Sequence, residues 1–326
     1  MKKIENRLYN TLHPRIDVHH HILPPEYILA LERIGVTVAP LPEWTAQKSL
    51  DIMDEHGIAA AITSISTPGV YFKDSSFSRD LARQCNEYSA KLMIDNPGRF
   101  GAFASLPLPD VEGSLRELEY AMDTLKLDGV VLMSNVEGRY LGDPAYSEIF
   151  TELNRRKTVV FIHPNDPPSS GGISDFVEYP YDATRAVASL MYAGVLDRYS
   201  KIRFVLAHAG GTVPFSSFRI SAVGMEMEIV HINSILKLLY NFMRRTKALK
   251  RMYYDTAAST DIYALRALAS HAKQSHLLFG TNYMWTPGSV IPLYIKELKE
   301  YDGFSERVLA TIERENALDL FPRLNG

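Results

Sequence analysis

Histidines are the residues of this chain whose type and spacing best suit metal chemistry. Three of them lie in the run Asp17-Val18-His19-His20-His21. Side chains alternate between the two faces of a strand, so we expect Asp17, His19 and His21 on one face and His20 on the other. Two imidazoles on one face, two residues apart, can hold one metal ion together. Taken alone, the run could also be a chance cluster of histidines.

Two further histidines end apolar runs that have the composition of buried strands. His163 closes the run VVFIH and is followed by a proline, which does not continue a central strand. His208 closes FVLAH, and the nearby Gly210 and Gly211 would let the backbone approach a ligand closely. A single histidine at the end of a strand is more often a hydrogen-bonded core residue. Two such positions, together with His19 and His21, instead predict a shared site.

The elements that must position these residues follow a regular alternation. Short apolar, β-branched runs are separated by longer stretches of helical spacing, for example Leu115–Leu125 and Ala183–Leu196. The expected strands are Ile16–His21, Ala60–Ile65, Gly101–Leu106, Gly129–Met133, Val159–His163, Arg203–His208, Met252–Asp255 and Leu277–Gly280. Alternating strands and helices imply a parallel sheet, which is either a closed barrel or a large doubly wound sheet.

The ends of the expected strands favour the barrel. Reactive residues lie at or just past the carboxyl ends of five of the eight strands, where barrel enzymes carry their chemistry; they are His19, His21, His163, His208, Asp255 and Asn282. The glycine-rich phosphate-binding motifs of doubly wound folds do not follow any of these strands. The sequence therefore predicts a (β/α)8 TIM barrel, and we expect residues 1–326 to form a single domain.

Composition limits the kinds of partner. The chain has 326 residues, is 46% hydrophobic and has a net charge of -3, which suits one large core and argues against nucleic acid as the main partner. Its only cysteine, Cys85, excludes an intramolecular disulfide, and we expect it to be a core residue of a cytoplasmic protein rather than a reactive thiol. The polar first residues and the lack of a long apolar run predict neither a signal peptide nor a membrane span.

One segment, 219–251, breaks the regular alternation. Its apolar residues recur at helical spacing; they are Ile229, Ile232, Ile235, Leu236, Leu239, Phe242 and Met243. A helix packed on the barrel wall would explain this stripe, and so would a helix that covers the site or meets a second subunit. We expect a homodimer to which the 229–243 helix contributes.

With these residues established, the chain resembles the amidohydrolase superfamily over most of its length. The resemblance is carried by IDVHHHILP at 16–24, FGAFASLPLPD at 100–110, VVFIHP at 159–164, LAHAGGTVPF at 206–215 and LLFGTNYMW at 277–285. Within the superfamily it is similar to the decarboxylase branch, which includes aminocarboxymuconate semialdehyde, γ-resorcylate and 6-methylsalicylate decarboxylases. The segment STPGVYF at 66–72 leans toward the 6-methylsalicylate-like members.

The resemblance implies roles for individual residues. His19, His21 and His163 would be metal ligands, and His208 would act as an acid/base or electrostatic residue beside the metal. Asn282 occupies the position where the family usually has Asp, which is the last metal ligand and a proposed proton donor. An amide oxygen can ligate a metal weakly, but it has neither a charge nor an acidic proton. An introduced Asp-to-Asn change and a natural variant with altered chemistry would both account for Asn282.

The function expected from this resemblance is metal-dependent, non-oxidative decarboxylation of an ortho-hydroxybenzoate. The cofactor would be one divalent ion, zinc first, with manganese or magnesium as alternatives. Hydrolysis of an amide or lactone is the alternative chemistry, and a catalytically impaired binding protein is the alternative outside enzymes. Candidate substrate-binding residues are Arg219, Phe72, Phe215 and Trp285. A surface salt bridge would equally explain the arginine, and ordinary packing would explain the aromatic residues.

Overall fold

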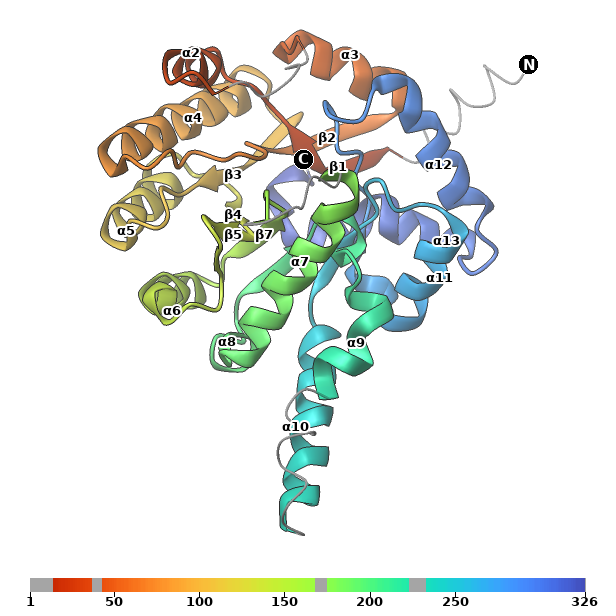
Figure 1. The fold of residues 1–326 in the computed structure, drawn as a ribbon. Helices are drawn as coiled ribbons and strands as arrows, with labels where there is room; N and C mark the ends of the chain where they lie inside the picture. Colours follow the sequence, from red (N-terminus) through yellow and green to blue (C-terminus); the bar gives the residue numbers. More distant parts are fainter. Residues whose placement is uncertain (1–13, 37–42, 168–174, 223–232, 326) are drawn as a thin grey trace, which may run out of the picture.

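A computed structural model describes residues 14–36, 43–167, 175–222 and 233–325 (Figure 1). The eight expected strands are all present and pair in parallel in the order β1-β2-β3-β4-β7-β8-β9-β10. Their bounds are β1 Arg15–His21, β2 Ile58–Ser64, β3 Phe100–Ser105, β4 Gly129–Met133, β7 Val159–His163, β8 Arg203–Leu206, β9 Tyr253–Asp255 and β10 Leu277–Leu278. The remaining edge closes through backbone hydrogen bonds from Val18 N to Phe279 O and from Asn282 N to His19 O. The predicted barrel is confirmed.

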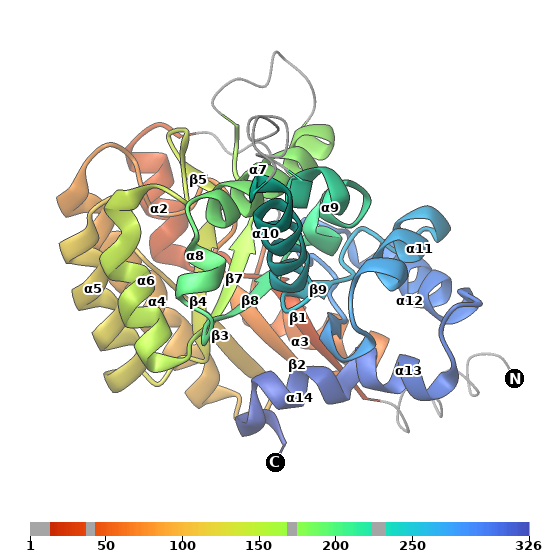
Figure 2. The same ribbon diagram turned by 90° about the horizontal axis from the view of Figure 1, so that it is seen from below.

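Helices surround the barrel and join successive strands (Figures 1 and 2). They are α2 Pro25–Arg33, α3 Ala46–His56, α4 Ser75–Asp95, α5 Val111–Glu119, α6 Ser147–Arg156, α7 Asp175–Tyr192, α8 Val195–Arg198, α9 Val213–Ala222, α10 Asn233–Leu249, α11 Ile262–His271, α12 Ile291–Glu300, α13 Glu306–Ala310 and α14 Asn316–Leu320. Asp74, Asp110 and Asp261 cap α4, α5 and α11 by accepting hydrogen bonds from first-turn backbone N–H groups. The segment expected as one helix over Leu115–Leu125 instead continues from α5 into a π-helical turn, Tyr120–Thr124.

The interior of the barrel is a packed core that is closed at one end. Inward-facing residues such as Ile62, Val131 and Phe161 form one buried cluster with Leu320 and Phe321 from the C-terminal segment. In Figure 2, α13 and α14 lie across this end of the barrel, at the amino ends of the strands. Because apolar side chains fill the barrel below, the polar groups of the site lie at the carboxyl ends of the strands.

An irregularity in β1 decides which of its residues face inward. Between Asp17 and His20, three residue steps on β1 match only two on β2, which is the geometry of a β-bulge. The Asp17 carboxylate therefore accepts hydrogen bonds from the Thr281 hydroxyl (2.6 Å) and from His20 Nδ1 (3.1 Å), on the outward side. The prediction that Asp17 shares a face with His19 and His21 is wrong, because strict alternation does not survive a bulge.

Helix α10 projects away from the barrel (Figure 1). Its C-terminal end is anchored by the buried Leu249, and Phe242 packs edge-on against Phe218 of α9. Leu236 and Met243 are 78% and 68% exposed, so packing against neighbouring elements explains Phe242 but not these two members of the expected stripe. The other members Ile229 and Ile232, and the side chain of Ile235, lie outside the described residues. None of the described helices combines the length and the hydropathy needed to cross a bilayer.

Candidate metal centre and active site

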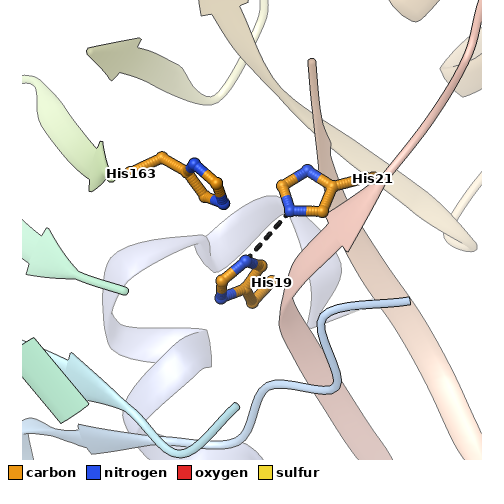
Figure 3. Close-up of side chains that lie close together, drawn as sticks. All are labelled: His19, His21 and His163. Carbon is orange, nitrogen blue, oxygen red and sulfur yellow. Dashed lines mark hydrogen bonds between the residues drawn. The ribbon is translucent and has the colours of Figure 1, made fainter. Parts of the chain in front are cut away.

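Three histidine rings converge at the carboxyl ends of β1 and β7. Figure 3 shows His19, His21 and His163 pointing toward one another. One ring nitrogen from each lies within 4.8 Å of the others, and Nε2 of His19 is 3.0 Å from Nε2 of His21. All three side chains are buried, and Nε2 of His163 has no hydrogen-bond partner among the described residues. This convergence is the arrangement expected of ligands to one metal ion.

The opposite nitrogens of the three rings are engaged behind the cluster. Nδ1 of His163 donates to the carbonyl of Pro164 at 2.8 Å. Nδ1 of His21 lies 3.3 Å from the carbonyl and 3.1 Å from the hydroxyl of Ser64. Because a carbonyl can only accept, the hydrogen of each neutral ring is on Nδ1. The Nε2 lone pairs of His21 and His163, and of His19 by the contact described next, therefore face one another, an unfavourable arrangement that a cation would relieve.

A buried carboxylate on β9 fixes the third ring. Oδ2 of Asp255 accepts from Nδ1 of His19 at 2.7 Å, while Oδ1 accepts from the backbone N–H groups of His208 (2.8 Å) and Ala257 (3.0 Å). Burial raises the pKa of Asp255 to about 7, although these N–H groups and the nearby His208 oppose the shift. The sequence predicts this residue at the end of a strand but indicates no specific role for it. The available signal was its position as the last residue of the apolar run Met252–Asp255.

The protonation of the cluster suits a cation. Burial lowers the pKa of His19, His21 and His163 well below the ordinary imidazole value, and neighbouring imidazoles lower it further. The rings are therefore neutral at neutral pH and keep their lone pairs available. Neutral imidazole nitrogens are the form in which histidine binds a metal.

His208 and Asn282 lie beside the cluster. The His208 ring centroid is 4.7 Å from that of His19 and 5.9 Å from that of His163, and its Nδ1 donates to the carbonyl of Ala257. Asn282 donates its backbone N–H to the carbonyl of His19 at 2.8 Å. Its side-chain oxygen is buried without a hydrogen-bond partner among the described residues. The residues present thus fit a divalent ion held by three imidazoles, with an amide oxygen as an available fourth donor.

The structure separates the candidate substrate-binding residues. Phe72 lines a cavity of about 300 Å³ at the carboxyl ends of the strands. Trp285 follows β10 and has a buried indole N–H without a hydrogen-bond partner in the described chain, but it does not line this cavity. Phe215 is 87% exposed and lines a separate groove beside α10, and Arg219 lies exposed on the same helix, α9. The structure therefore does not bring Phe215 or Arg219 to the cavity, and their roles remain predictions.

Comparison with known proteins agrees with this geometry. The amidohydrolase family model matches residues 16–323. The chain belongs to the amidohydrolase family. Its relatives include the 6-methylsalicylic acid decarboxylase of Penicillium expansum, which is 34% identical and covers 96% of this chain and 97% of its own length. The decarboxylase yanB of Aspergillus niger is 33% identical over 95% of this chain and 88% of its own length. This amidohydrolase therefore falls in the decarboxylase branch.

Solved structures share the fold of this amidohydrolase. An amidohydrolase II structure superposes with a TM-score of 0.85 at 26% identity and covers 96% of this chain and 100% of its own. The dihydroxybenzoic acid decarboxylase of Polaromonas sp. JS666, solved with bound manganese and 2-nitroresorcinol, has a TM-score of 0.80 at 20% identity. It covers 96% of this chain and 98% of its own. These likenesses extend over the whole barrel.

Proposed function

We propose that this amidohydrolase is a metal-dependent, non-oxidative decarboxylase of an aromatic acid with a hydroxyl group ortho to its carboxylate. The observation that carries the proposal is the convergence of three neutral imidazoles whose Nε2 lone pairs face one another. Decarboxylases that match nearly the whole chain supply the reaction class. Both supports are needed, since a histidine cluster alone fits hydrolysis equally well.

In this proposal His19, His21 and His163 hold one divalent ion, and Asn282 offers a weak fourth ligand. Zinc is the first choice because it accepts imidazole nitrogen readily, and manganese or magnesium are alternatives. When bound, the ion would take one oxygen from the carboxylate and one from the hydroxyl group of the substrate and so fix its orientation. The apolar residues packed below the cluster, such as Phe161, keep water away from the inner side of the rings.

The reaction requires one proton at the ring carbon that carries the carboxylate. When that carbon gains the proton, the bond to the carboxylate breaks, CO2 leaves, and the electron pair of the broken bond restores the aromatic ring. We assign the proton delivery to the imidazolium form of His208, in which Nδ1 donates to the Ala257 carbonyl and Nε2 carries the proton that is transferred. Asn282 supplies no negative charge to anchor the ion, so the chain as given should turn over slowly.

The direct test loads the metal-free protein with zinc, manganese or magnesium and measures CO2 release from salicylate and methylsalicylates. Release that depends on the metal and disappears in His163→Ala is the expected result. Hydrolysis of an aromatic amide or lactone without CO2 release would overturn the proposal in favour of a hydrolase. Tight binding of the aromatic acid without turnover, even after Asn282→Asp, would identify a binding protein instead.

We also propose that the protein is a cytoplasmic homodimer. The exposed apolar side chains of α10, which include Leu236, Leu239 and Met243, support self-association, because such a stripe on a projecting helix is costly to leave in water. The single cysteine, Cys85, is free and buried, and this supports a reducing compartment.

A further inference from the structure

The cavity lined by Phe72 lies beside the strand that carries His163, although none of the four site histidines is in its lining. It lies at the carboxyl ends of β3, β4 and β7 and has a volume of about 300 Å³. Met133 pairs in register with His163, and both side chains belong to the inward-facing set of their strands. Met133 and Asn165, which lies two residues after His163, both line the cavity. A group bound at the histidines could therefore extend directly into this space.

The size of the cavity suits a single small molecule. Ligand sites in proteins usually range from about 300 to 1,000 Å³, and this one is at the lower limit. A cavity of about 150 Å³ can hold a benzene ring, so this space can take one aromatic ring with a short substituent.

The wall of the cavity is mainly apolar. Val70, Phe72, Leu108, Met133 and Val136 supply most of it, from the loops after β2 and β3, the end of β4, and the hairpin that follows β4. Val70 and Leu108 are only 5% exposed, so these side chains are fixed parts of the structure. An alkyl group placed against them would leave water without disturbing a hydrogen bond.

The charged groups of the cavity are acidic. Glu137 and Asp166 are in its lining, and the described lining residues include no lysine, arginine or histidine. Lys73 lies 3.6 Å from Glu137, but it is outside the lining, and their side chains are 84% and 51% exposed. This arrangement disfavours a second negative charge on a bound molecule.

A buried hydrogen-bond network preforms the cavity. Asp182 of α7 is fully buried and accepts hydrogen bonds from the Ser134 hydroxyl, from Asn135 Nδ2 (3.1 Å) and from the Tyr140 hydroxyl (2.7 Å). These contacts tie the hairpin after β4 to α7. The backbone N–H of Asn165 donates to the Ser134 hydroxyl at 2.8 Å, which fixes the wall nearest His163.

We propose that this cavity binds an uncharged, apolar substituent on the ring of a monocarboxylic aromatic acid, and that it selects against substrates with a second carboxylate. The inference rests on the proposed function and adds the class of substrate. Short alkyl groups match the apolar wall. A second carboxylate on the substrate would meet Glu137 and Asp166, and the described lining offers that carboxylate no lysine, arginine or histidine.

Binding measurements test this without requiring turnover. Calorimetry on the zinc-loaded protein would compare salicylate with its methyl, ethyl and propyl derivatives at each free ring position. At one position we expect the affinity to rise about fourfold for each added CH2 group, since each transfers from water to an apolar wall. Salicylates with a second carboxylate should bind at least about tenfold more weakly than salicylate. A flat alkyl series, or tighter binding of a dicarboxylate, would overturn the inference.

Two substitutions of Val136 should change the affinity for long alkyl derivatives in opposite directions. Val136→Phe should reduce the affinity for the propyl derivative at least about tenfold and leave that for salicylate within about threefold, because the added ring fills the cavity. Val136→Ala should shift the preference toward longer alkyl groups. Thermal unfolding checks that both variants fold. If neither variant changes the ratio of propyl derivative to salicylate affinity, the cavity is not the alkyl site.

Two glutamate-to-lysine substitutions test the effect of charge in the cavity. Glu137→Lys should improve dicarboxylate binding relative to salicylate, while Glu112→Lys, the same change at an exposed site on α5, should not. Equal effects of the two changes would contradict the inference. Failure of salicylate itself to bind, even after Asn282→Asp, would overturn the proposed function as well. Salicylate binding without alkyl or charge selectivity overturns this inference alone.

Discussion

Nδ1 of His19 and Oδ2 of Asp255 lie 2.7 Å apart, and both side chains are completely buried. The carboxylate holds the ring hydrogen on the far side of His19 and leaves Nε2 facing His21 and His163. The three histidines and Asn282 are all neutral ligands. Asp255 therefore supplies a group that can carry negative charge directly behind one of them, His19. A carboxylate behind a ligating histidine strengthens the ligand and fixes its orientation.

Replacing this carboxylate should weaken metal binding. For Asp255→Asn we expect an affinity for zinc that is lower by about 10- to 100-fold, because the amide removes the charge and can present the wrong group to His19. Competition with a chelator of known affinity measures the change. The control is Asp261→Asn at the exposed N-cap of α11, where asparagine caps equally well. Equal affinities of the two variants would exclude this role for Asp255.

The histidines of β1 should differ sharply in their effect on metal content. His19→Ala, His21→Ala or His163→Ala should each remove most of the bound metal, since each deletes one of three converging nitrogens. His20→Ala should retain it, because His20 bonds Asp17 and Ser49 on the outward side. Elemental analysis after dialysis, with thermal unfolding as the check on folding, gives the answer. The assignment fails if all four variants lose metal equally.

Restoring the carboxylate at position 282 should increase activity. For Asn282→Asp we expect CO2 release from a salicylate-like acid to be at least about 100-fold faster, because the variant gains both an anionic ligand and a possible proton donor. The two proteins would be compared after saturation with the same metal. Equal rates in both would remove this position from the mechanism.

The exposed stripe of α10 should determine the oligomeric state. We expect a dimer in light scattering at micromolar concentration, and a monomer after Leu236→Glu combined with Met243→Glu, because buried charges without partners oppose association. Leu29→Glu, at an equally exposed position on α2, should remain a dimer. A monomeric wild-type protein, or dissociation by the α2 change alone, would contradict the prediction.

A buried ion pair at the closed end of the barrel should be important for stability. Arg15 and Glu313 are 2.8 Å apart, with side-chain exposures of 0% and 2%. Glu313→Gln removes the negative charge that faces the buried Arg15 guanidinium and should cost about 3–5 kcal/mol of unfolding free energy. The nearby Glu315→Gln removes only an exposed pair with Arg307 and should cost less than about 1 kcal/mol. Denaturant titrations of both variants would detect a difference of this size, and similar losses would contradict it.

Local sequence patterns determined the barrel and most of its metal site. Hydrophobic runs and helical spacing are properties of neighbouring residues, so the eight strands and their order along the chain could be predicted. The convergence of His19, His21, His163 and His208 followed from the barrel itself, because the carboxyl ends of all its strands meet at one mouth. The family resemblance added the expected role of Asn282.

Tertiary structure decided everything that depends on pairing between distant segments. The outward position of Asp17 comes from a bulge in the register of β1 against β2, which alternation within one strand cannot reveal. The contact between His19 and Asp255 joins residues 236 positions apart, and the cavity beside His163 is enclosed by loops from several strands. Helix α10 kept its predicted periodicity, but only its place in the fold left the stripe exposed. Periodicity fixes which residues share a face, whereas packing between remote elements fixes what that face meets.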